Sequence, residues 1–364
     1  SEKEKKRKME KFKKSWEFHG RTLTVENGEI AKQAGGSVVV RYDDTVVLSV
    51  ATASNQAKDT DFFPLTVLYN EKMYAAGKIP GGFLRREGRP TEHATLTARL
   101  IDRPIRPLFA EGFRNEVQVV NTVMSCDPDA SSEMTALFGS SLALCVSNIP
   151  FNGPVAGVVV AKVDDEYVIN PSVEQAERAV LSLTVGTKQA INMVEAGAKE
   201  VSEDEMLTAL QIGHDAIKEL CAIEEEVIAE CAKEKMEVVL YEIDPSIKAY
   251  VDEHAADEIR KAVSIKGKLE SYGRIEELKN QMVEEIGAME YEDEAAQIKA
   301  QKQAAEYCVE VEAAEIRRLI SEDKVRPDGR KLDELRPLNS QVDLLPRVHG
   351  SAMFTRGETQ VISV

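Results

Sequence analysis

Alternating apolar and polar positions near the start of the chain predict paired β-strands. Short alternating runs surround Asn27-Gly28, a dipeptide typical of hairpin turns. The segment SVVVRYDDTVVLSVATA has two runs rich in β-branched residues on either side of Tyr42-Asp43-Asp44, which predicts a second hairpin. The first 14 residues are rich in lysine and lack apolar periodicity, so we expect a solvated helix or a frayed tail there.

Helical and strand patterns then alternate as far as about residue 235. A helix is predicted from about Thr91 to Ile101, where Pro104 and Pro107 end it. An apolar helix is expected at Ser132–Ser147, and the capping box Ser202–Glu205 opens a long amphipathic helix. Strands are predicted at Val117–Met124, Val155–Lys162, Glu166–Ile169, Ala179–Val185 and Ala190–Glu195.

Beyond Pro245 the composition changes. Glu, Lys and Ala dominate at helical spacing up to about Glu322, which predicts a small all-helical domain. The following KVRPDGRKLDELRP is typical of a linker into another β segment. The fold class is therefore α+β, with mixed sheets and packed helices followed by an all-α domain. The predicted divisions are a charged tail at 1–15, a core at 16–235, helices at 236–322, and a linker with strands at 323–364.

The last segment repeats an earlier one. Gly28–Val50 aligns with Val342–Val364 without a gap, and Asp44 meets Glu358. Two unrelated hairpins with similar turns would give the same pattern. If the repeat is real, the chain holds only the opening of a second core, and we expect a fragment because an isolated hairpin is unstable. Identical pairs are Gly36/Gly350, Ser37/Ser351, Thr45/Thr359, Val47/Val361, Ser49/Ser363 and Val50/Val364.

Composition excludes several protein classes. The 364 residues contain 43% hydrophobic residues, no apolar run near the roughly 20 residues that cross a bilayer, and no signal peptide. We therefore expect no membrane partner. Five cysteines without a CxxC pair argue against disulfides or a zinc site and fit a reducing cytoplasm.

Positive charge is concentrated although the net charge is −17. Arg99, Arg103 and Arg106 have i, i+4, i+7 spacing, which places them on one helical face. Guanidinium groups arranged in this way suit phosphate oxygens. Alternatively, these arginines pair with carboxylates and only stabilise the fold, and Asp102 could orient one of them.

A glycine-containing loop precedes this helix. Ile79–Arg86 ends in aromatic, aliphatic and paired cationic residues, and Arg89 follows. An exposed Phe83 beside Arg85 and Arg86 could stack a nucleobase while the cations hold phosphate. The alternative is a buried Phe83.

These residues carry a family resemblance. YAAGKIPGGFLRREGRPTEHATLTARLIDRPIRPLF resembles the signature region of the polynucleotide phosphorylase family, in the first of its two ribonuclease PH-like cores. FFPLTVLY and IPFNGPVAGV resemble the same core, and VRPDGRKLDELRPL and HGSAMFTRGETQ are similar to the opening of the second core. The resemblance runs from about Trp16 to Val364. The family writes the loop as FFRR, so Leu84 replaces an aromatic residue.

The resemblance implies a ribonuclease PH-like core, an all-helical domain and a truncated second core. It implies part of a phosphorolytic 3′-to-5′ exoribonuclease that converts RNA and phosphate reversibly into nucleoside diphosphates. Such enzymes are homotrimeric rings that admit single-stranded RNA. Arg99, Arg103 and Arg106 match arginines that face a neighbouring core and bind RNA or phosphate. Residues that match the RNA-gripping loop are Phe83, Arg85, Arg86 and Arg89.

Catalysis is expected elsewhere. The resemblance places the phosphate-holding serine loop and the acids that hold magnesium or manganese beyond Val364, so we expect this chain to be inactive and to bind no metal. In the equivalent loop, Cys126–Met134, three acids (Asp127, Asp129 and Glu133) would repel phosphate, and Ser132 is expected to cap a helix. The alternative is a non-catalytic scaffold that binds RNA or assembles with partner cores.

Overall fold

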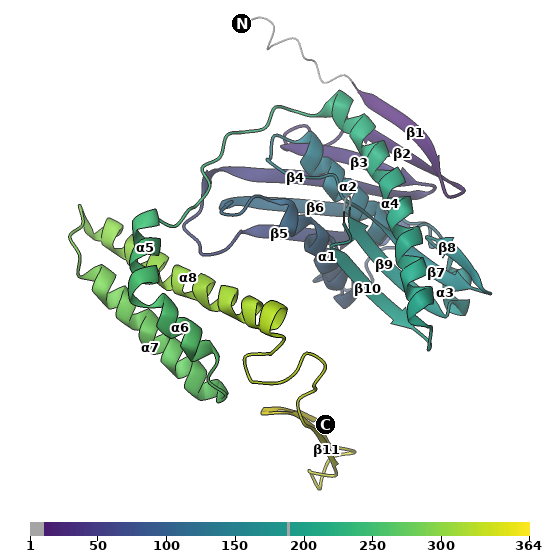
Figure 1. Cartoon of the computed structure of the whole chain (residues 1–364). Coiled ribbons are helices and arrows are strands. Elements are labelled where there is room, and N and C mark those ends of the chain that lie inside the picture. Colours follow the sequence, from purple (N-terminus) through teal and green to yellow (C-terminus); the bar gives the residue numbers. More distant parts are fainter. Residues whose placement is uncertain (1–10, 188–189) are drawn as a thin grey trace, which may run out of the picture. The chain divides into compact units, whose positions relative to one another are not determined.

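The computed structural model describes residues 11–187 and 190–364. The chain divides into two compact units, one ending at Tyr241 and the other spanning Glu242–Val364 (Figure 1). The first unit has two sheets and the second has one, and each unit has its own helices. The predicted boundary, after residue 235, precedes the observed one. Residues 236–241 belong to the first unit, since Met236 N donates to Asn148 O and Tyr241 N donates to Gly112 O.

A six-stranded sheet begins the first unit, in the order β1-β2-β3-β4-β6-β5. All neighbours are antiparallel except β5 and β6, which are parallel. Buried valines of β3 and β4 form much of its core face. The strands are β1 (Phe12–Phe18), β2 (Arg21–Asn27), β3 (Gly36–Tyr42), β4 (Thr45–Ala57), β5 (Leu65–Glu71) and β6 (Asn115–Ser125).

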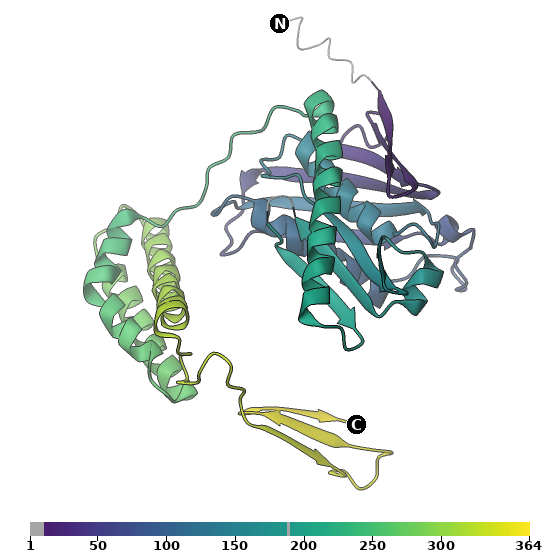
Figure 2. The same ribbon diagram turned by 45° about the vertical axis from the view of Figure 1, so that its right-hand side comes forward.

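A four-stranded antiparallel sheet, in the order β10-β9-β7-β8, completes the first unit. Its strands are β7 (Ala156–Val163), β8 (Glu166–Ile169), β9 (Leu181–Thr187) and β10 (Met193–Ala198). The helices of this unit are α1 (Glu92–Ile105), α2 (Ser132–Val146), α3 (Val173–Arg178) and α4 (Glu203–Cys231), with short 3-10 turns η2 (Met73–Ala76) and η3 (Arg106–Leu108). Figures 1 and 2 show α4 running along the outside of the second sheet.

Helix α2 is buried along its length and packs against β3, β4 and β7. The contact with β3 and β4 is so close that two positions, both occupied by glycine, have no room for a Cβ atom. A Cβ atom at Gly36 would lie 2.1 Å from Ala143 O, and one at Gly139 would lie 2.3 Å from Ser49 Oγ. These glycines therefore set the distance between α2 and the first sheet.

Most of the predicted elements are confirmed. The hairpin of β3 and β4 turns at Asp43-Asp44, and the capping box at Ser202 opens α4. The tight turn expected at Asn27-Gly28 is wrong: residues 28–35 form a longer loop, and the tight turn lies at His19-Gly20 between β1 and β2. Residues 12–15, expected in the tail, belong to β1, and the tail's residues 1–10 lie outside the described residues.

Three local expectations need correction. Pro104 lies inside the last turn of α1 instead of ending the helix, since its missing N–H affects a single helical bond. Ser131, one residue before the predicted cap, accepts the hydrogen bond from Met134 N and caps α2. The strand expected at Ala190–Glu195 is displaced to Met193–Ala198.

The second unit contains the predicted helices and a three-stranded antiparallel sheet. A short π-helical turn, η4, closes the last helix. The elements are α5 (Pro245–His254), α6 (Ala256–Val263), α7 (Lys268–Gly287), α8 (Glu294–Arg318), η4 (Leu319–Asp323), β11 (Leu338–Val342), β12 (Ala352–Arg356) and β13 (Thr359–Ser363).

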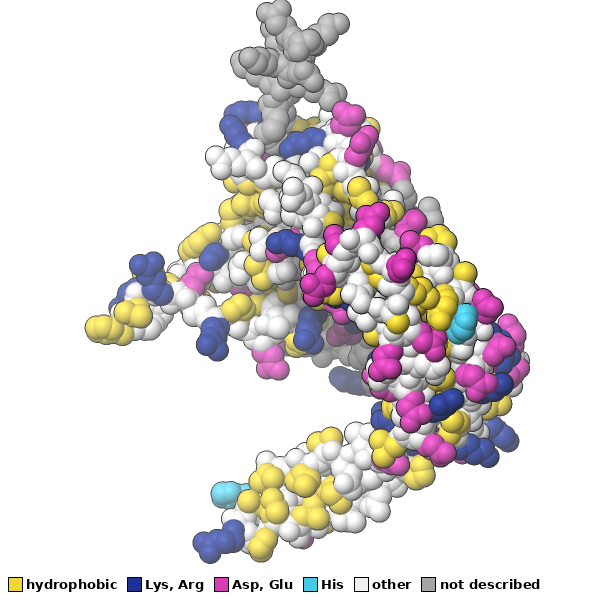
Figure 3. Space-filling model, turned by 90° about the vertical axis from the view of Figure 1, so that its left-hand side faces the viewer, with side chains coloured by type: hydrophobic (Ala, Val, Ile, Leu, Met, Phe, Trp, Pro, Cys, Tyr) yellow, Lys and Arg dark blue, Asp and Glu magenta, His cyan; other side chains and the backbone are white. Residues whose placement is uncertain are grey.

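Strand register agrees with the alignment of the internal repeat. Tyr42 pairs with Thr45 and Val38 with Ser49, and the aligned positions pair in the same way, Arg356 with Thr359 and Ala352 with Ser363. Because both hairpins turn over two residues at aligned positions, this register follows from the turns, and two unrelated hairpins with such turns would share it. Phe354 and Val361 are exposed, whereas their counterparts in the first sheet, Val40 and Val47, are buried. Figure 3 shows hydrophobic side chains gathered on this sheet, the lowest segment in that view.

Gly36→Ala is expected to destabilise the first unit by about 1–3 kcal/mol, because its Cβ would overlap a backbone oxygen that cannot rotate away. Urea unfolding followed by circular dichroism measures the change. Gly81→Ala is the matched control, since a Cβ there meets no atom within 4 Å. Equal unfolding midpoints for the two variants would contradict this account of the α2 contact.

Candidate nucleic-acid interface

The loop between η2 and α1 presents its aromatic and basic residues to solvent. Phe83 is 100% exposed and Leu84 is 76% exposed. The alternative of a buried Phe83 is therefore excluded for this chain. Within residues 11–187 and 190–364, no hydrogen bond or ion pair engages the side chains of Arg85, Arg86 or Arg89, which are also exposed.

A tight turn places the two apolar residues at the tip of this loop. Arg85 N donates to Gly82 O over 3.0 Å, so Phe83 and Leu84 occupy the central positions of the turn. Arg85 itself has φ 50°, in the left-handed region. The two apolar side chains are thus held away from the body, with Arg85 and Arg86 directly behind them.

Glu87, the acid of this loop, is directed toward the body of the unit. Its carboxylate accepts hydrogen bonds from Lys72 Nζ at 2.9 Å and from Met73 N at 3.0 Å. The hydrogen bond from Lys72, followed by that from the Met73 amide, lowers the pKa of Glu87. This contact closes the base of the loop and leaves the neighbouring arginines without an internal counterion.

A second contact closes the same loop nearer to the core. His93 Nδ1 lies 3.2 Å from Glu71 Oε1, and His93 Nε2 lies 3.1 Å from Glu133 Oε1. Glu71 ends β5, His93 lies in the first turn of α1, and Glu133 lies in the first turn of α2. Both ring nitrogens donate only when histidine is protonated, so this bridge is complete in the charged form.

The three arginines that follow have different surroundings. Arg99 is exposed and makes no ion pair among the described residues, and Arg103 pairs at the surface with Glu195 at 3.1 Å. Arg106 donates to both carboxylate oxygens of Asp102 and to two main-chain oxygens, one of Phe63 in the loop before β5 and one of Leu65, the first residue of β5. Most of the N–H groups of Arg106 are thus engaged internally, as the structural alternative expects, and its binding of RNA or phosphate stays a prediction.

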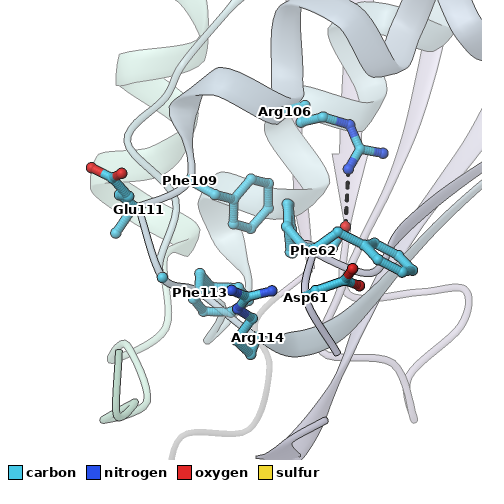
Figure 4. A pocket seen from close by; sticks show the side chains of 10 residues that line it. Asp61, Phe62, Arg106, Phe109, Glu111, Phe113 and Arg114 are labelled. Carbon is cyan, nitrogen blue, oxygen red and sulfur yellow. Dashed lines mark hydrogen bonds between the residues drawn. The ribbon is translucent and has the colours of Figure 1, made fainter. Parts of the chain in front are cut away.

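Arg106 also lines a pocket of 260 Å³ in the first unit. Figure 4 shows Phe109 and Phe113 on one side, Asp61 and Phe62 on the other, and Arg106 and Arg114 at the two ends. Beneath it, the Phe63 ring lies 4.5 Å from that of Phe109 and 5.3 Å from that of Phe113, centre to centre. Sequence reasoning did not find this pocket, because its walls come from segments about forty residues apart.

The loop at Cys126–Met134 is acidic and its hydroxyls are engaged. Ser131 Oγ donates to Glu133 at 2.7 Å, and Tyr69 donates to Ser132 Oγ at 2.8 Å. Burial, with added repulsion from Glu133, Glu71 and Asp127, raises the pKa of Cys126. The same three carboxylates would repel a phosphate ion, and the expectation that this loop binds none stays a prediction.

Family comparisons match three consecutive regions of the chain. Residues 19–150 match the 3′ exoribonuclease family, domain 1, and residues 153–216 match domain 2 of that family. Residues 246–331 match the polyribonucleotide nucleotidyltransferase RNA-binding domain. The chain belongs to the polyribonucleotide nucleotidyltransferase (polynucleotide phosphorylase) family.

Curated relatives agree with this assignment. The polyribonucleotide nucleotidyltransferase of Enterococcus faecalis is 58% identical over 357 residues, which cover 97% of this chain and 50% of the relative. That of Bacillus licheniformis is 56% identical over 98% of this chain and 50% of the relative. The chain thus spans about half the length of these relatives. A crystal structure of rice Rrp46 is 13% identical, with TM-score 0.47, over 58% of this chain and 96% of that chain.

The polyribonucleotide nucleotidyltransferase family explains the order of the units, a ribonuclease PH-like core followed by helices. Phe83, Arg85, Arg86 and Arg89 lie together on one exposed loop, and their contact with RNA stays a prediction. The bridges through Glu87 and His93 escaped sequence reasoning, because no motif marks them. Among the described residues, no helix is long and apolar enough to cross a membrane.

Glu87→Gln is expected to loosen the arginine-bearing loop, since it removes the charge that Lys72 contacts. Because folding lowers the pKa of Glu87, its contribution is present above the unfolded carboxyl pKa and is lost as pH falls through the folded value. Hydrogen exchange of residues 79–90 at neutral pH should quicken in the variant, and in the wild type as pH falls through the lowered pKa of Glu87, after correction for intrinsic rates. Glu166→Gln is the control, and unchanged protection in Glu87→Gln would refute the anchoring role.

Proposed function

We propose that this chain is the RNA-guiding half of a phosphorolytic 3′-to-5′ exoribonuclease. The reaction would convert single-stranded RNA and inorganic phosphate into nucleoside diphosphates, and it would be reversible. Family membership supports the reaction type, and the exposed loop with Phe83 and its unpaired arginines carries the role of this half. We place the protein in the cytoplasm, as a homotrimer in its complete form.

Guidance would rest on sequence-independent contacts. A nucleobase stacks on the fully exposed Phe83 ring, while Arg85 and Arg86 hold the adjoining phosphates. Every base has a flat face and every nucleotide has a phosphate, so such a grip accepts any single strand. Because Leu84 stands where the family has a second aromatic residue, stacking here would rely on Phe83 alone.

The chemical step would belong to the other half of the complete protein. Among residues 11–187 and 190–364, no group of three or more His, Cys, Asp or Glu side chains is arranged to hold a metal ion. The residues present therefore do not fit the magnesium or manganese that the family resemblance implies. The acidic surroundings of Cys126 likewise oppose phosphate. We propose that the ion and the phosphate are bound in the second core.

The same observations favour a second candidate, a scaffold that binds RNA or assembles with partner cores without supporting catalysis. Its RNA surface would be the same loop. Activity of a longer chain decides between the two.

Arg85→Ala/Arg86→Ala should weaken binding of single-stranded RNA and reduce its salt dependence. Each phosphate contact on a single strand contributes about 0.7 to the slope of log K against log salt, so the slope should fall by about 1.4. Fluorescence anisotropy at several salt concentrations measures it. Arg178→Ala, an exposed arginine on α3, should leave the slope unchanged. An unaltered slope in the double variant would show that the loop does not hold RNA.

Phosphate-dependent release of nucleoside diphosphates, measured with magnesium, should be undetectable for this chain and present for a chain extended through the second core. The physical reason is that no metal-binding group of three or more His, Cys, Asp or Glu side chains lies among the described residues, and that the acidic loop at Cys126 repels inorganic phosphate. Activity of the short chain would overturn the division of labour. Inactivity of both chains, with RNA binding intact, would favour the scaffold.

A further inference from the structure

The pocket beside Arg106 has the chemistry of a nucleobase site. We infer that it binds one base of a single-stranded RNA, with preference for bases that carry an exocyclic amino group. The inference rests on the proposed function, since it adds a second contact point for the same strand. Phe62, Arg106 and Arg114 line it together with Asp61 and Glu111, and Figure 4 shows Asp61 beside Phe62 and the carboxylate of Glu111 turned away from the other labelled side chains.

The size of the pocket limits its occupant. Its volume is 260 Å³, below the roughly 300–1,000 Å³ of pockets that hold drug-sized ligands. One planar ring system fits this space, whereas a whole dinucleotide does not. The sugar and phosphates would therefore remain outside, on the surface.

Two flat groups line the pocket for stacking. Phe62 is 62% exposed, whereas Phe63, Phe109 and Phe113 of the same lining pack against one another. The Arg106 guanidinium lies over the Phe63 ring, 5.6 Å from its centre, and its bonds to Asp102 and to main-chain oxygens fix its plane. Bases in single-stranded RNA stack on aromatic rings and on guanidinium planes.

Polar groups around the pocket favour a base over a phosphate. Asp61 and Glu111 are exposed, and neither carboxylate has a hydrogen bond or an ion pair within the described parts of the chain. The Asp61 carboxylate can accept a hydrogen bond from an amino group in the pocket, and both carboxylates repel a phosphate. Among the described residues, Arg114 Nη1 is buried and has no hydrogen-bond partner. An acceptor atom of the base would provide that hydrogen bond.

The position of the pocket suits a strand that also contacts α1. Arg103 and Arg99 precede Arg106 by about 4.5 and 10.5 Å along the helix axis, at 1.5 Å per residue. Their exposed guanidinium groups are placed to hold phosphates outside the pocket. A cationic row beside an aromatic wall is the common construction of single-strand binding surfaces.

Phe62→Ala in this chain tests the stacking wall. Binding of an oligoadenylate should weaken at least about fivefold, the lower end of the loss on removing a stacked aromatic ring. Leu207→Ala is the matched control, because Leu207 is also 62% exposed but lies on α4, away from the pocket. Circular dichroism verifies folding. Equal affinity of Phe62→Ala and wild type for oligoadenylate would overturn the proposal.

Asp61→Ala/Glu111→Ala tests the base preference. Wild type should bind oligoadenylate more tightly than oligouridylate of equal length, because uracil lacks an exocyclic amino group, and the variant should lose this ratio. The ratio is the readout because removing negative charge raises affinity for both RNAs. A ratio near one in wild type, or an unchanged ratio in the variant, would overturn the proposal.

The two proposals fail in distinguishable ways. If RNA binds and responds to Arg85→Ala/Arg86→Ala but not to Phe62→Ala, only the base pocket is refuted. If wild type binds no single-stranded RNA at low salt, both are refuted.

Discussion

The close packing of α2 against β3 and β4 is the contact on which the rest of the first unit depends. Gly36 and Gly139 allow that approach, and buried Asn121 Oδ1 accepts hydrogen bonds from Ser49 and Ser140 at 2.6 and 2.9 Å. Asn121 lies on β6, which pairs with both β4 and β5. The position of β5, and hence of the arginine-bearing loop that follows it, is set through this chain of contacts.

Electrostatics distinguishes two loops of this unit. A net charge of −17 opposes RNA overall, yet the acid nearest the exposed arginines is bound to Lys72 and turned inward. Repulsion over the whole molecule is screened within roughly 8–10 Å at physiological salt, whereas direct contacts with phosphate are not. A polyanion close to the loop would therefore interact mainly with the loop's own positive charge and only weakly with the net charge of the whole chain. The loop at Cys126 is negatively charged instead, because the carboxylates of Glu133, Glu71 and Asp127 lie near Cys126 and the loop contains no arginine to pair with them.

Much of the candidate site was readable from sequence because it is local. The loop at Ile79–Arg86 carries its aromatic residue and cations within a few positions, and the helical spacing of Arg99 and Arg103 needs only a periodicity. The role of Arg106 was not readable in this way. Its main-chain acceptors lie more than forty residues earlier in the chain, so the contacts that fix its guanidinium group depend on the packing of distant segments.

The sequence by itself determined the order of elements, the internal repeat and the family, because hydrophobic periodicity, turn chemistry and motifs are written in consecutive residues. Only the tertiary structure decided that Phe83 is exposed, that Glu87 and His93 close the loop, and that Asp61, Phe62 and Glu111 surround one pocket. The physical reason is that burial and ion pairing depend on which distant segments the packing of α2 and the sheets brings together. No local pattern encodes those distances.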